Sequence, residues 1–239
     1  VDWEIYAAAL YDALLNLRPY QSYLEDVVTS LACLESAQVL DAGCGTGNVL
    51  ARLNNGRRTL HGLDYSEAML GRAHDKLSTA ATLTKGDLQE PLPYPDQYFS
   101  HLVCANVLYT VPEPMAMLRE LARVAQPGVR LVLTTPKTGY EAGYILREHA
   151  DDGSDPALWQ NLYASPERER ELITRAISDE SLRTAFLEIG KHNQRIEHGK
   201  DTRFYSREDL ALLMREAGFT TVSINTTYAD QVLLGCFTL

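Results

Sequence analysis

Residues 39–48 read Val39-Leu-Asp-Ala-Gly-Cys-Gly-Thr-Gly-Asn48, an apolar run that passes into three closely spaced glycines. A strand that ends in such a glycine cluster and leads into a helix lets a ligand approach the backbone closely. The glycines fall as G-x-G-x-G rather than as the G-x-G-x-x-G of dinucleotide-binding loops. Asp41 comes two residues before the first glycine, where a carboxylate repels a pyrophosphate but suits a cation. The loop therefore predicts a positively charged nucleoside ligand that carries no phosphate.

Strands and helices alternate along the chain on both sides of this loop. Short apolar runs of strand length occur at residues 38–41, 59–64, 82–85, 99–105, 129–135, 220–226 and 231–238. Helical patterns lie between them at residues 48–54, 66–77, 114–124 and 206–217. This alternation indicates crossover connections, and the short link between the last two strands suits an antiparallel hairpin. We predict an α/β fold: a Rossmann-like, doubly wound, mostly parallel seven-stranded sheet with an antiparallel last strand.

The alternation is interrupted once, between residues 137 and 202. This stretch has turn-forming residues at 151–156 and two helical patterns, one opened by Ser165-Pro166 and one ending at Gly190. Two further helices are expected before the glycine loop, separated by Pro19. We divide the chain into an N-terminal helical lid at 1–36, a Rossmann-like domain at 37–136 and 203–239, and a helical cap insertion at 137–202.

Composition narrows the class of protein further. The 239 residues carry a formal net charge of −10, which disfavours nucleic acid as a partner because phosphate neutralisation needs Lys and Arg. No apolar stretch is long enough for a membrane span, and the first residues lack the pattern of a secretory signal. The four cysteines, Cys33, Cys44, Cys104 and Cys236, are widely spaced, which predicts reduced thiols, no metal site and a cytoplasmic location.

Three more segments follow predicted strands and complete a pattern. Asp64 ends the second strand in Gly62-Leu-Asp-Tyr-Ser66, Gly86-Asp-Leu88 follows the third, and Ala105-Asn-Val-Leu-Tyr109 follows the fourth. With the glycine loop at these intervals, the sequence resembles the class I S-adenosylmethionine-dependent methyltransferases. The resemblance is to their small-molecule group, which includes ubiquinone- and menaquinone-biosynthesis enzymes. It covers residues 36–136 and 203–239.

The resemblance implies S-adenosylmethionine as cofactor and S-adenosylhomocysteine as its product. It places Asp41 near the methionine ammonium group, Asp64 on the ribose hydroxyls and Asp87 on the adenine amino group. An N-terminal tyrosine, Tyr11 or Tyr20, would reach the cofactor carboxylate. The full set of implied cofactor-binding residues is Asp41, Gly43, Cys44, Gly45, Asn48, Asp64, Tyr65, Met69, Gly86, Asp87, Leu88, Asn106, Val107, Tyr11 and Tyr20.

The implied reaction is an in-line transfer of a methyl group to a small-molecule acceptor, with oxygen or nitrogen favoured as the acceptor atom. Because alignment alone lowers the barrier substantially, a general base is optional. Candidates for one are Tyr109, His149 and His192. The cap contributes aromatic and apolar side chains that suit a partly apolar or aromatic acceptor but would equally serve to pack the cap: Tyr140, Tyr144, Ile145, Trp159, Tyr163, Leu172 and Phe186.

Two alternatives remain open from the sequence. One is a nicotinamide-dependent oxidoreductase, which the acid before the loop and the displaced third glycine disfavour. The other is a catalytically silent binding partner with a methyltransferase-like fold. The segment Cys104-Ala-Asn-Val107 lacks the Pro-Pro turn typical of enzymes that methylate the amino groups of nucleic-acid bases.

Overall fold

A computed structural model describes residues 10–198 and 202–239. Within these residues the strands form one seven-stranded sheet in the order β3-β2-β1-β4-β5-β7-β6. Their bounds are β1 Gln38–Ala42, β2 Thr59–Asp64, β3 Thr82–Lys85, β4 Phe99–Ala105, β5 Ala125–Pro136, β6 Thr220–Thr227 and β7 Val232–Thr238. Strands β1 to β5 pair in parallel, and β7 is antiparallel to both β5 and β6. The predicted fold class is confirmed.

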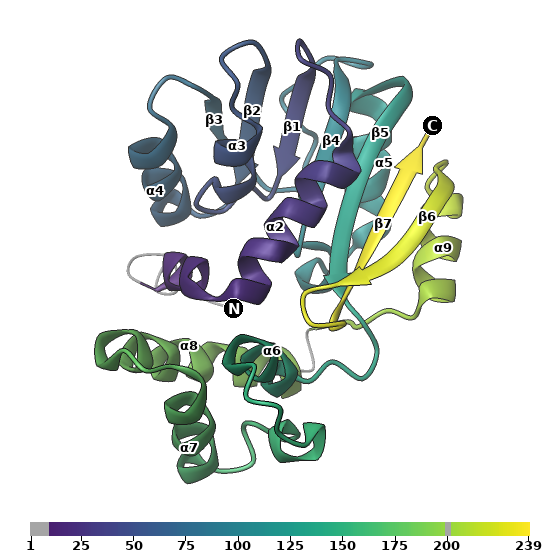
Figure 1. The fold of residues 1–239 in the computed structure, drawn as a ribbon. Coiled ribbons are helices and arrows are strands. Elements are labelled where there is room, and N and C mark those ends of the chain that lie inside the picture. Colours follow the sequence, from purple (N-terminus) through teal and green to yellow (C-terminus); the bar gives the residue numbers. More distant parts are fainter. Residues whose placement is uncertain (1–9, 199–201) are drawn as a thin grey trace.

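The sheet is buried on both faces, which explains the continuous apolar runs of its central strands. Val39 of β1 belongs to one hydrophobic cluster and its neighbour Leu40 to the other, because successive side chains of a strand point to opposite faces. Figure 1 shows α2 (Arg18–Leu31), α3 (Asn48–Leu53) and α4 (Glu67–Leu77) on one side of the sheet, and α5 (Pro114–Val124) and α9 (Arg207–Glu216) on the other.

Serine caps set the starts of the crossover helices. The Ser66 hydroxyl accepts the Met69 backbone N–H at 3.1 Å, which begins α4 directly after β2. Ser206 and Asp209 form a reciprocal capping box at the start of α9. Both starts agree with the sequence pattern, because each depends on residues adjacent in the chain.

The first helices differ in detail from the prediction. A 3₁₀-helix, η1 (Tyr11–Asn16), precedes α2, and α2 begins at Arg18, so Pro19 lies inside its first turn. Proline is tolerated there because the first N–H groups of a helix have no intrahelical partner. The start of the predicted first helix lies outside the described residues.

Helices α6 (Ala142–Ala150), α7 (Pro166–Ala176) and α8 (Glu180–His198) and the 3₁₀-helix η3 (Pro156–Trp159) follow β5 and lie beyond the carboxyl ends of the parallel strands (Figure 1). The prediction that a helix ends at Gly190 is wrong, because α8 continues through this residue. A Cβ at Gly190 would lie 1.7 Å from Glu169 Oε1. The glycine therefore provides room for the buried Glu169 side chain against α8 rather than a helix stop.

Candidate functional site

The glycine loop wraps tightly between β2 and the turn after β4. Gly43, Gly45 and Gly47 all have positive φ angles, of 79°, 51° and 76°. The N–H groups of Gly43 and Cys44 donate to the carbonyl of Leu63 at 2.7 and 3.0 Å. A Cβ at Gly43 would lie 2.3 Å from Cγ2 of Val107. Only glycine at this position lets the loop approach the opposite wall of the site.

Asp64 fixes the loop from the end of β2. Its Oδ2 accepts the Gly45 N–H at 2.8 Å, and its Oδ1 accepts the Ser66 N–H at 2.9 Å. The two bonds orient the carboxylate between the glycine loop and the start of α4. Such an oriented carboxylate is suited to accept hydrogen bonds from vicinal hydroxyls.

The turn after β4 has a left-handed residue that is held by hydrogen bonds from β5 and α2. Asn106 has a φ of 55°, and its N–H donates to Thr134 Oγ1 at 3.0 Å. The Thr134 hydroxyl also bonds the buried Tyr23 hydroxyl at 2.8 Å. A chain of hydrogen bonds from α2 through β5 thereby supports the left-handed conformation of Asn106.

A cavity of about 370 Å³ opens at the carboxyl ends of β1, β2, β3 and β4. Ligands of open α/β sheets bind at this edge. The predicted residues that line it are Tyr11, Gly43, Gly45, Asp64, Tyr65, Met69, Gly86, Asp87, Leu88, Asn106 and Val107. Its wall also includes Ala105, the first residue of the predicted segment after β4, and four residues that the sequence did not point to: Gln89, Thr110, Val111 and Pro112. These four directly follow the predicted segments that end at Leu88 and Tyr109, so extending those segments by one to three residues would have included them.

A second cavity of about 30 Å³ lies under the glycine loop. The remaining predicted residues line it: Asp41, Cys44, Asn48 and Tyr20. Tyr11 lines both cavities, which places η1 where they meet. The structure thus brings together every residue for which the resemblance implied a cofactor contact.

Asp41 is the unusual member of this group. It is 1 % exposed, and its Oδ1 has no hydrogen-bond partner within the described residues. Burial raises the pKa of Asp41 to about 8, and the negative charge of Asp64 contributes further to this rise. A buried carboxyl with one unpartnered oxygen, in a cavity beside a glycine loop, fits the ammonium group of an amino acid. The residues present therefore suit a ligand with a methionine-like end.

The loop that carries Asp87 is anchored to α5. Arg123 donates to Asp96 Oδ1 at 2.8 Å and to the Leu92 carbonyl at 3.0 Å, and its neighbour Glu120 accepts the Leu92 N–H at 2.8 Å. The Arg123 guanidinium also lowers the pKa of Glu120. This clamp holds the proline-rich connection to β4 and with it the segment expected to contact adenine.

The general-base candidates that the structure describes do not line the two cavities. Tyr109 is buried, lies in the 3₁₀-helix η2 (Leu108–Thr110) and lines neither cavity; burial raises the pKa of its hydroxyl. His149 Nδ1 accepts the Arg18 N–H at 3.2 Å at the start of α2, and His149 also lines neither cavity. The side chain of His192 lies outside the described ones. The geometry therefore gives neither Tyr109 nor His149 a position from which to act as a base.

The aromatic cap residues also lie away from these cavities. Trp159 is fully buried, and its Nε1–H donates to Ser154 Oγ at 2.7 Å. Ile145, Leu172 and Phe186 belong to the same buried cluster as α2. These side chains pack the cap helices against the rest of the molecule, because a two-layer arrangement of helices needs its own apolar contacts.

The described residues contain no group of three or more His, Cys, Asp or Glu that could hold a metal ion. In the same part of the chain, no helix is long and apolar enough to cross a membrane. Burial raises the pKa of the Cys104 thiol to about 12 and that of Cys44 well above its usual range. These thiols are protonated fillers of the β1 and β4 ends.

The sheet order and its covering helices define a Rossmann-like fold, and comparisons with known proteins make the class more specific. The family described as "Methyltransferase domain" matches residues 40–133. YqeM of Bacillus subtilis, named as a methyltransferase, is 24% identical over 231 residues, covering 93% of this chain and 89% of that protein. The demethylmenaquinone methyltransferase of Shouchella clausii is 30% identical over 128 residues. That match covers 51% of this chain and 54% of the relative, so the chain spans about half the length of this enzyme.

The fold of the chain is also similar to that of a solved methyltransferase. Magnesium protoporphyrin IX methyltransferase from Synechocystis, solved with bound S-adenosylhomocysteine, superimposes with a TM-score of 0.58 at 20% identity and covers 92% of this chain and 83% of that one. In sequence and in fold the chain is similar to the class I S-adenosylmethionine-dependent methyltransferases. It is therefore an enzyme whose cofactor is S-adenosylmethionine. The comparisons give no support to a nicotinamide-dependent oxidoreductase.

Proposed function

We propose that this enzyme methylates an oxygen or nitrogen atom of a small molecule, with the cofactor held across the two cavities. When bound, S-adenosylmethionine supplies a methyl group already activated on a sulfonium. The chain's own residues then bind the cofactor and the acceptor, orient them toward each other and exclude water. Orientation of this kind lowers the barrier to methyl transfer by up to about 7–11 kcal/mol. The observation that carries the proposal is the buried Asp41 carboxyl, whose Oδ1 has no hydrogen-bond partner among the described residues and which lines the small cavity together with Tyr11.

The size and lining of the cavity at the carboxyl ends of β1 to β4 favour a small acceptor. Its volume of about 370 Å³ is within the usual range for small-molecule sites. Beyond the glycine loop its wall is formed by Thr110, Val111 and Pro112, which mix apolar surface with one hydroxyl. A partly apolar or aromatic acceptor suits this wall. In this proposal residues 1–36 act as a lid and residues 137–202 as a cap on the acceptor side.

The titratable side chains favour oxygen or nitrogen over carbon as the acceptor atom. None of the described residues on the two cavity walls is a histidine or lysine. A carbon acceptor needs a base to remove its proton, whereas a neutral amine or a phenolate already presents a lone pair. The acceptor would therefore arrive in its nucleophilic form, and the enzyme would act by alignment.

The names of the relatives suggest one test acceptor. The demethylmenaquinone methyltransferases act, by their name, on a quinone-type ring, which is a partly apolar aromatic molecule. Because the match covers about half of such an enzyme, a quinol belongs in the acceptor panel as a comparison. Methylation of a quinol ring carbon alone, with no oxygen or nitrogen product, would contradict the proposed acceptor atom.

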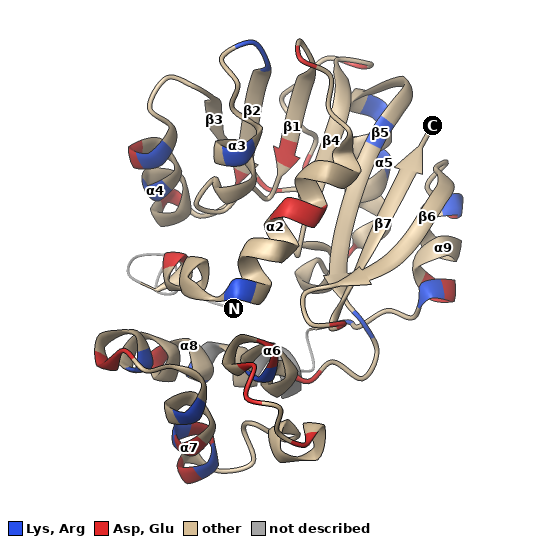
Figure 2. Ribbon diagram, in the orientation of Figure 1, with Lys and Arg blue, Asp and Glu red and all other residues tan. Residues whose placement is uncertain are grey.

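The distribution of charge supports a small molecule over nucleic acid. Figure 2 shows Lys and Arg spread over many elements and interspersed with Asp and Glu. With a net charge of −10, the chain lacks the excess of basic residues that a polyanion requires. The cytoplasmic location predicted above remains part of the proposal, to be tested by fractionating cells that express the tagged chain.

Two measurements test the proposal. Calorimetry with S-adenosylhomocysteine on wild type, Asp64→Ala and Asp64→Asn tests the cofactor site. We expect Asp64→Ala to raise the Kd at least about tenfold, because it removes an oriented, partly buried acceptor, while the circular dichroism spectrum is retained. An unchanged Kd would contradict the ribose assignment. Incubation with methyl-labelled cofactor and a metabolite extract, followed by mass spectrometry, should give a labelled small molecule; label appearing only in nucleic acid would refute the acceptor class.

A further inference from the structure

Helix η1 carries Tyr11 to the junction of the two cavities, yet it has little stability of its own. It is six residues long and contains no buried residue. Runs of 3₁₀-helix longer than three or four residues are uncommon, because their hydrogen-bond geometry is poor. The position of η1 therefore depends on side-chain contacts with neighbouring elements.

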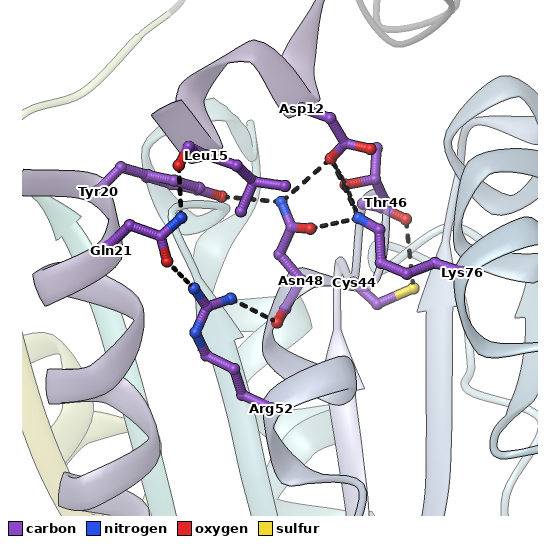
Figure 3. A network of polar contacts seen from close by, with 10 residues as sticks. Asp12, Leu15, Tyr20, Gln21, Cys44, Thr46, Asn48, Arg52 and Lys76 are labelled. Carbon is purple, nitrogen blue, oxygen red and sulfur yellow. Dashed lines mark hydrogen bonds and ion pairs between the residues drawn. The ribbon is translucent and has the colours of Figure 1, made fainter. Parts of the chain in front are cut away.

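The strongest of these contacts is made by Asp12. Figure 3 shows its carboxylate facing a threonine, an asparagine and a lysine from two other elements. Asp12 Oδ1 accepts from Thr46 Oγ1 at 2.7 Å, from Asn48 Nδ2 at 3.3 Å and from Lys76 Nζ at 3.1 Å. One oxygen atom thus joins η1 to the glycine loop, to the start of α3 and to α4.

Lys76 completes this network from the last turn of α4. Its ammonium group also donates to Thr46 Oγ1 at 3.3 Å and to Asn48 Oδ1. The side chains of Lys76 and Asp12 are 23% and 38% exposed, whereas those of the surface pair Arg57 and Glu35 are 69% and 75% exposed. The partly buried pair is screened less by water and salt, so its attraction is stronger.

The other end of η1 is tied separately. The Leu15 carbonyl accepts from the Gln21 amide, and the Gln21 carbonyl oxygen accepts from Arg52, which also donates to the Asn48 carbonyl at 3.3 Å (Figure 3). These contacts hold η1 next to α2 and α3 without an ion pair. At the other end of η1 the Tyr11 ring packs edge-on against the Tyr20 ring, with 6.4 Å between the ring centroids, and the Asp12–Lys76 ion pair is the charged contact at that end.

We propose that Asp12 and Lys76 are positioning residues that hold η1, and through it Tyr11, closed over the cofactor. Neither residue lines the two cavities, so both act through Tyr11 and the loop. If only the closed form binds tightly, the apparent Kd equals the intrinsic Kd divided by the closed fraction. Weakening the ion pair lowers that fraction and speeds release of the cofactor and its product.

The test measures Kd and dissociation rate for S-adenosylhomocysteine in wild type, Asp12→Asn, Lys76→Gln and the double variant. Each single variant is expected to raise both quantities about three- to tenfold, and the double variant no further, because either change removes the same ion pair. Lys76→Arg should retain most of the wild-type affinity, because it keeps the charge. Arg57→Ala, which removes a charge of the same sign on the loop before β2, serves as control and should leave Kd within twofold.

The salt dependence of cofactor-product binding tests the ion pair without any substitution. Raising sodium chloride from 0.05 to 1 M shortens the Debye length from about 14 to about 3 Å; because the pair is only partly exposed, the wild-type Kd should move part of the way toward that of Lys76→Gln, whose own Kd should change less with salt. Hydrogen exchange of ligand-free protein requires no cofactor: amides of residues 11–16 should exchange faster in Lys76→Gln than in wild type. Equal Kd values in all variants, additive effects in the double variant, or unchanged exchange of residues 11–16 would overturn the proposal. If one variant failed to fold, the other single variant compared with Lys76→Arg, together with the wild-type salt dependence, would still decide.

Discussion

At Asp41, the burial that lowers the stability of the ligand-free protein is expected to favour binding of the ligand. A carboxyl with 1 % exposure and an unpartnered oxygen costs free energy in the ligand-free protein, because its charged form has lost water without gaining a counter-charge. The same atom offers a nearby ammonium group an acceptor in surroundings of low polarity. A binding site that stores such a cost releases it when its ligand arrives.

The Asp41→Asn variant should be more stable than the ligand-free wild type but should bind the cofactor product less tightly. The folded-state pKa of about 8 is raised above the ordinary value of 3.8, so the favourable contribution of Asp41 is present at low pH and is lost as pH rises through 8. Asp41→Asn removes this loss, and its stability advantage over ligand-free wild type should grow between about pH 4 and 8 and then level off. Urea unfolding at pH 5, 7 and 8.5 measures it.

In the same variant the affinity for S-adenosylhomocysteine should fall, because the ammonium group loses its carboxylate. The affinity of the wild type for S-adenosylhomocysteine should rise from pH 6 to 8, because Asp41 becomes easier to ionise. The affinity of Asp41→Asn should not depend on pH in this way. Titration calorimetry at the two pH values checks both. A variant that is less stable and binds equally well would contradict the role assigned to Asp41.

Elements in this protein meet where glycines leave room for a neighbour. Gly143 in the first turn of α6 faces the chain at the end of η3, and a Cβ there would lie 1.7 Å from the carbonyl oxygen of Trp159. That atom belongs to the backbone, so it cannot move aside without shifting η3. Gly71 in α4 is the opposite case, because a Cβ there would meet nothing within 4 Å.

The pair Gly143→Ala and Gly71→Ala separates packing from helix propensity. Gly71→Ala should stabilise the protein by about 0.5–1 kcal/mol, because alanine loses less backbone entropy in a helix. Gly143→Ala should destabilise it by about 1–3 kcal/mol, because the overlap forces η3 away from α6. Chemical denaturation with a common slope measures both changes. Equal effects of the two substitutions would show that close packing at Trp159 does not govern the cap.

The whole molecule is built on two hydrophobic clusters, one on each face of the sheet. The cluster on the α2 face also contains Trp159, Leu172 and Phe186, so the cap helices and the seven-stranded sheet share one core. Helix α6 contacts α2, and α8 contacts η1. A shared core of this kind couples the unfolding of the cap to that of the sheet.

We therefore expect a single thermal transition that the cofactor product shifts as a whole. At one hundred times its Kd, S-adenosylhomocysteine should stabilise the folded state by about 2.7 kcal/mol, which corresponds to a rise in Tm of roughly 5–10 °C for a chain of this size. Circular dichroism, and the fluorescence of Trp159 in a Trp3→Phe background, should report the same Tm. A cap signal that melts earlier and does not respond to the ligand would contradict the coupling.

Much of the fold was readable from local patterns. The α/β alternation, the caps at Ser66 and Ser206 and the glycine loop all depend on residues close together in the chain, so their physics is present in the sequence. The segments at Asp64, Asp87 and Asn106 were also predictable, because parallel strands bring their carboxyl ends to one edge of the sheet. The end of α8 could not be predicted, because in the sequence a glycine inside a helix cannot be told from one that ends it until the side chain packed against it is known.

The sequence by itself determined the class of fold, the cofactor and the segments that meet at one edge of the sheet. Only the tertiary structure decided which side chains reach the site: it kept Tyr109 and His149 off the cavity walls, placed the cap aromatics in the core and brought Asp12 to Lys76 across 64 positions of chain. The reason is physical. Turns, caps and strand ends are governed by neighbouring residues, whereas burial, pKa shifts and ion pairs depend on elements that meet only when the chain is folded.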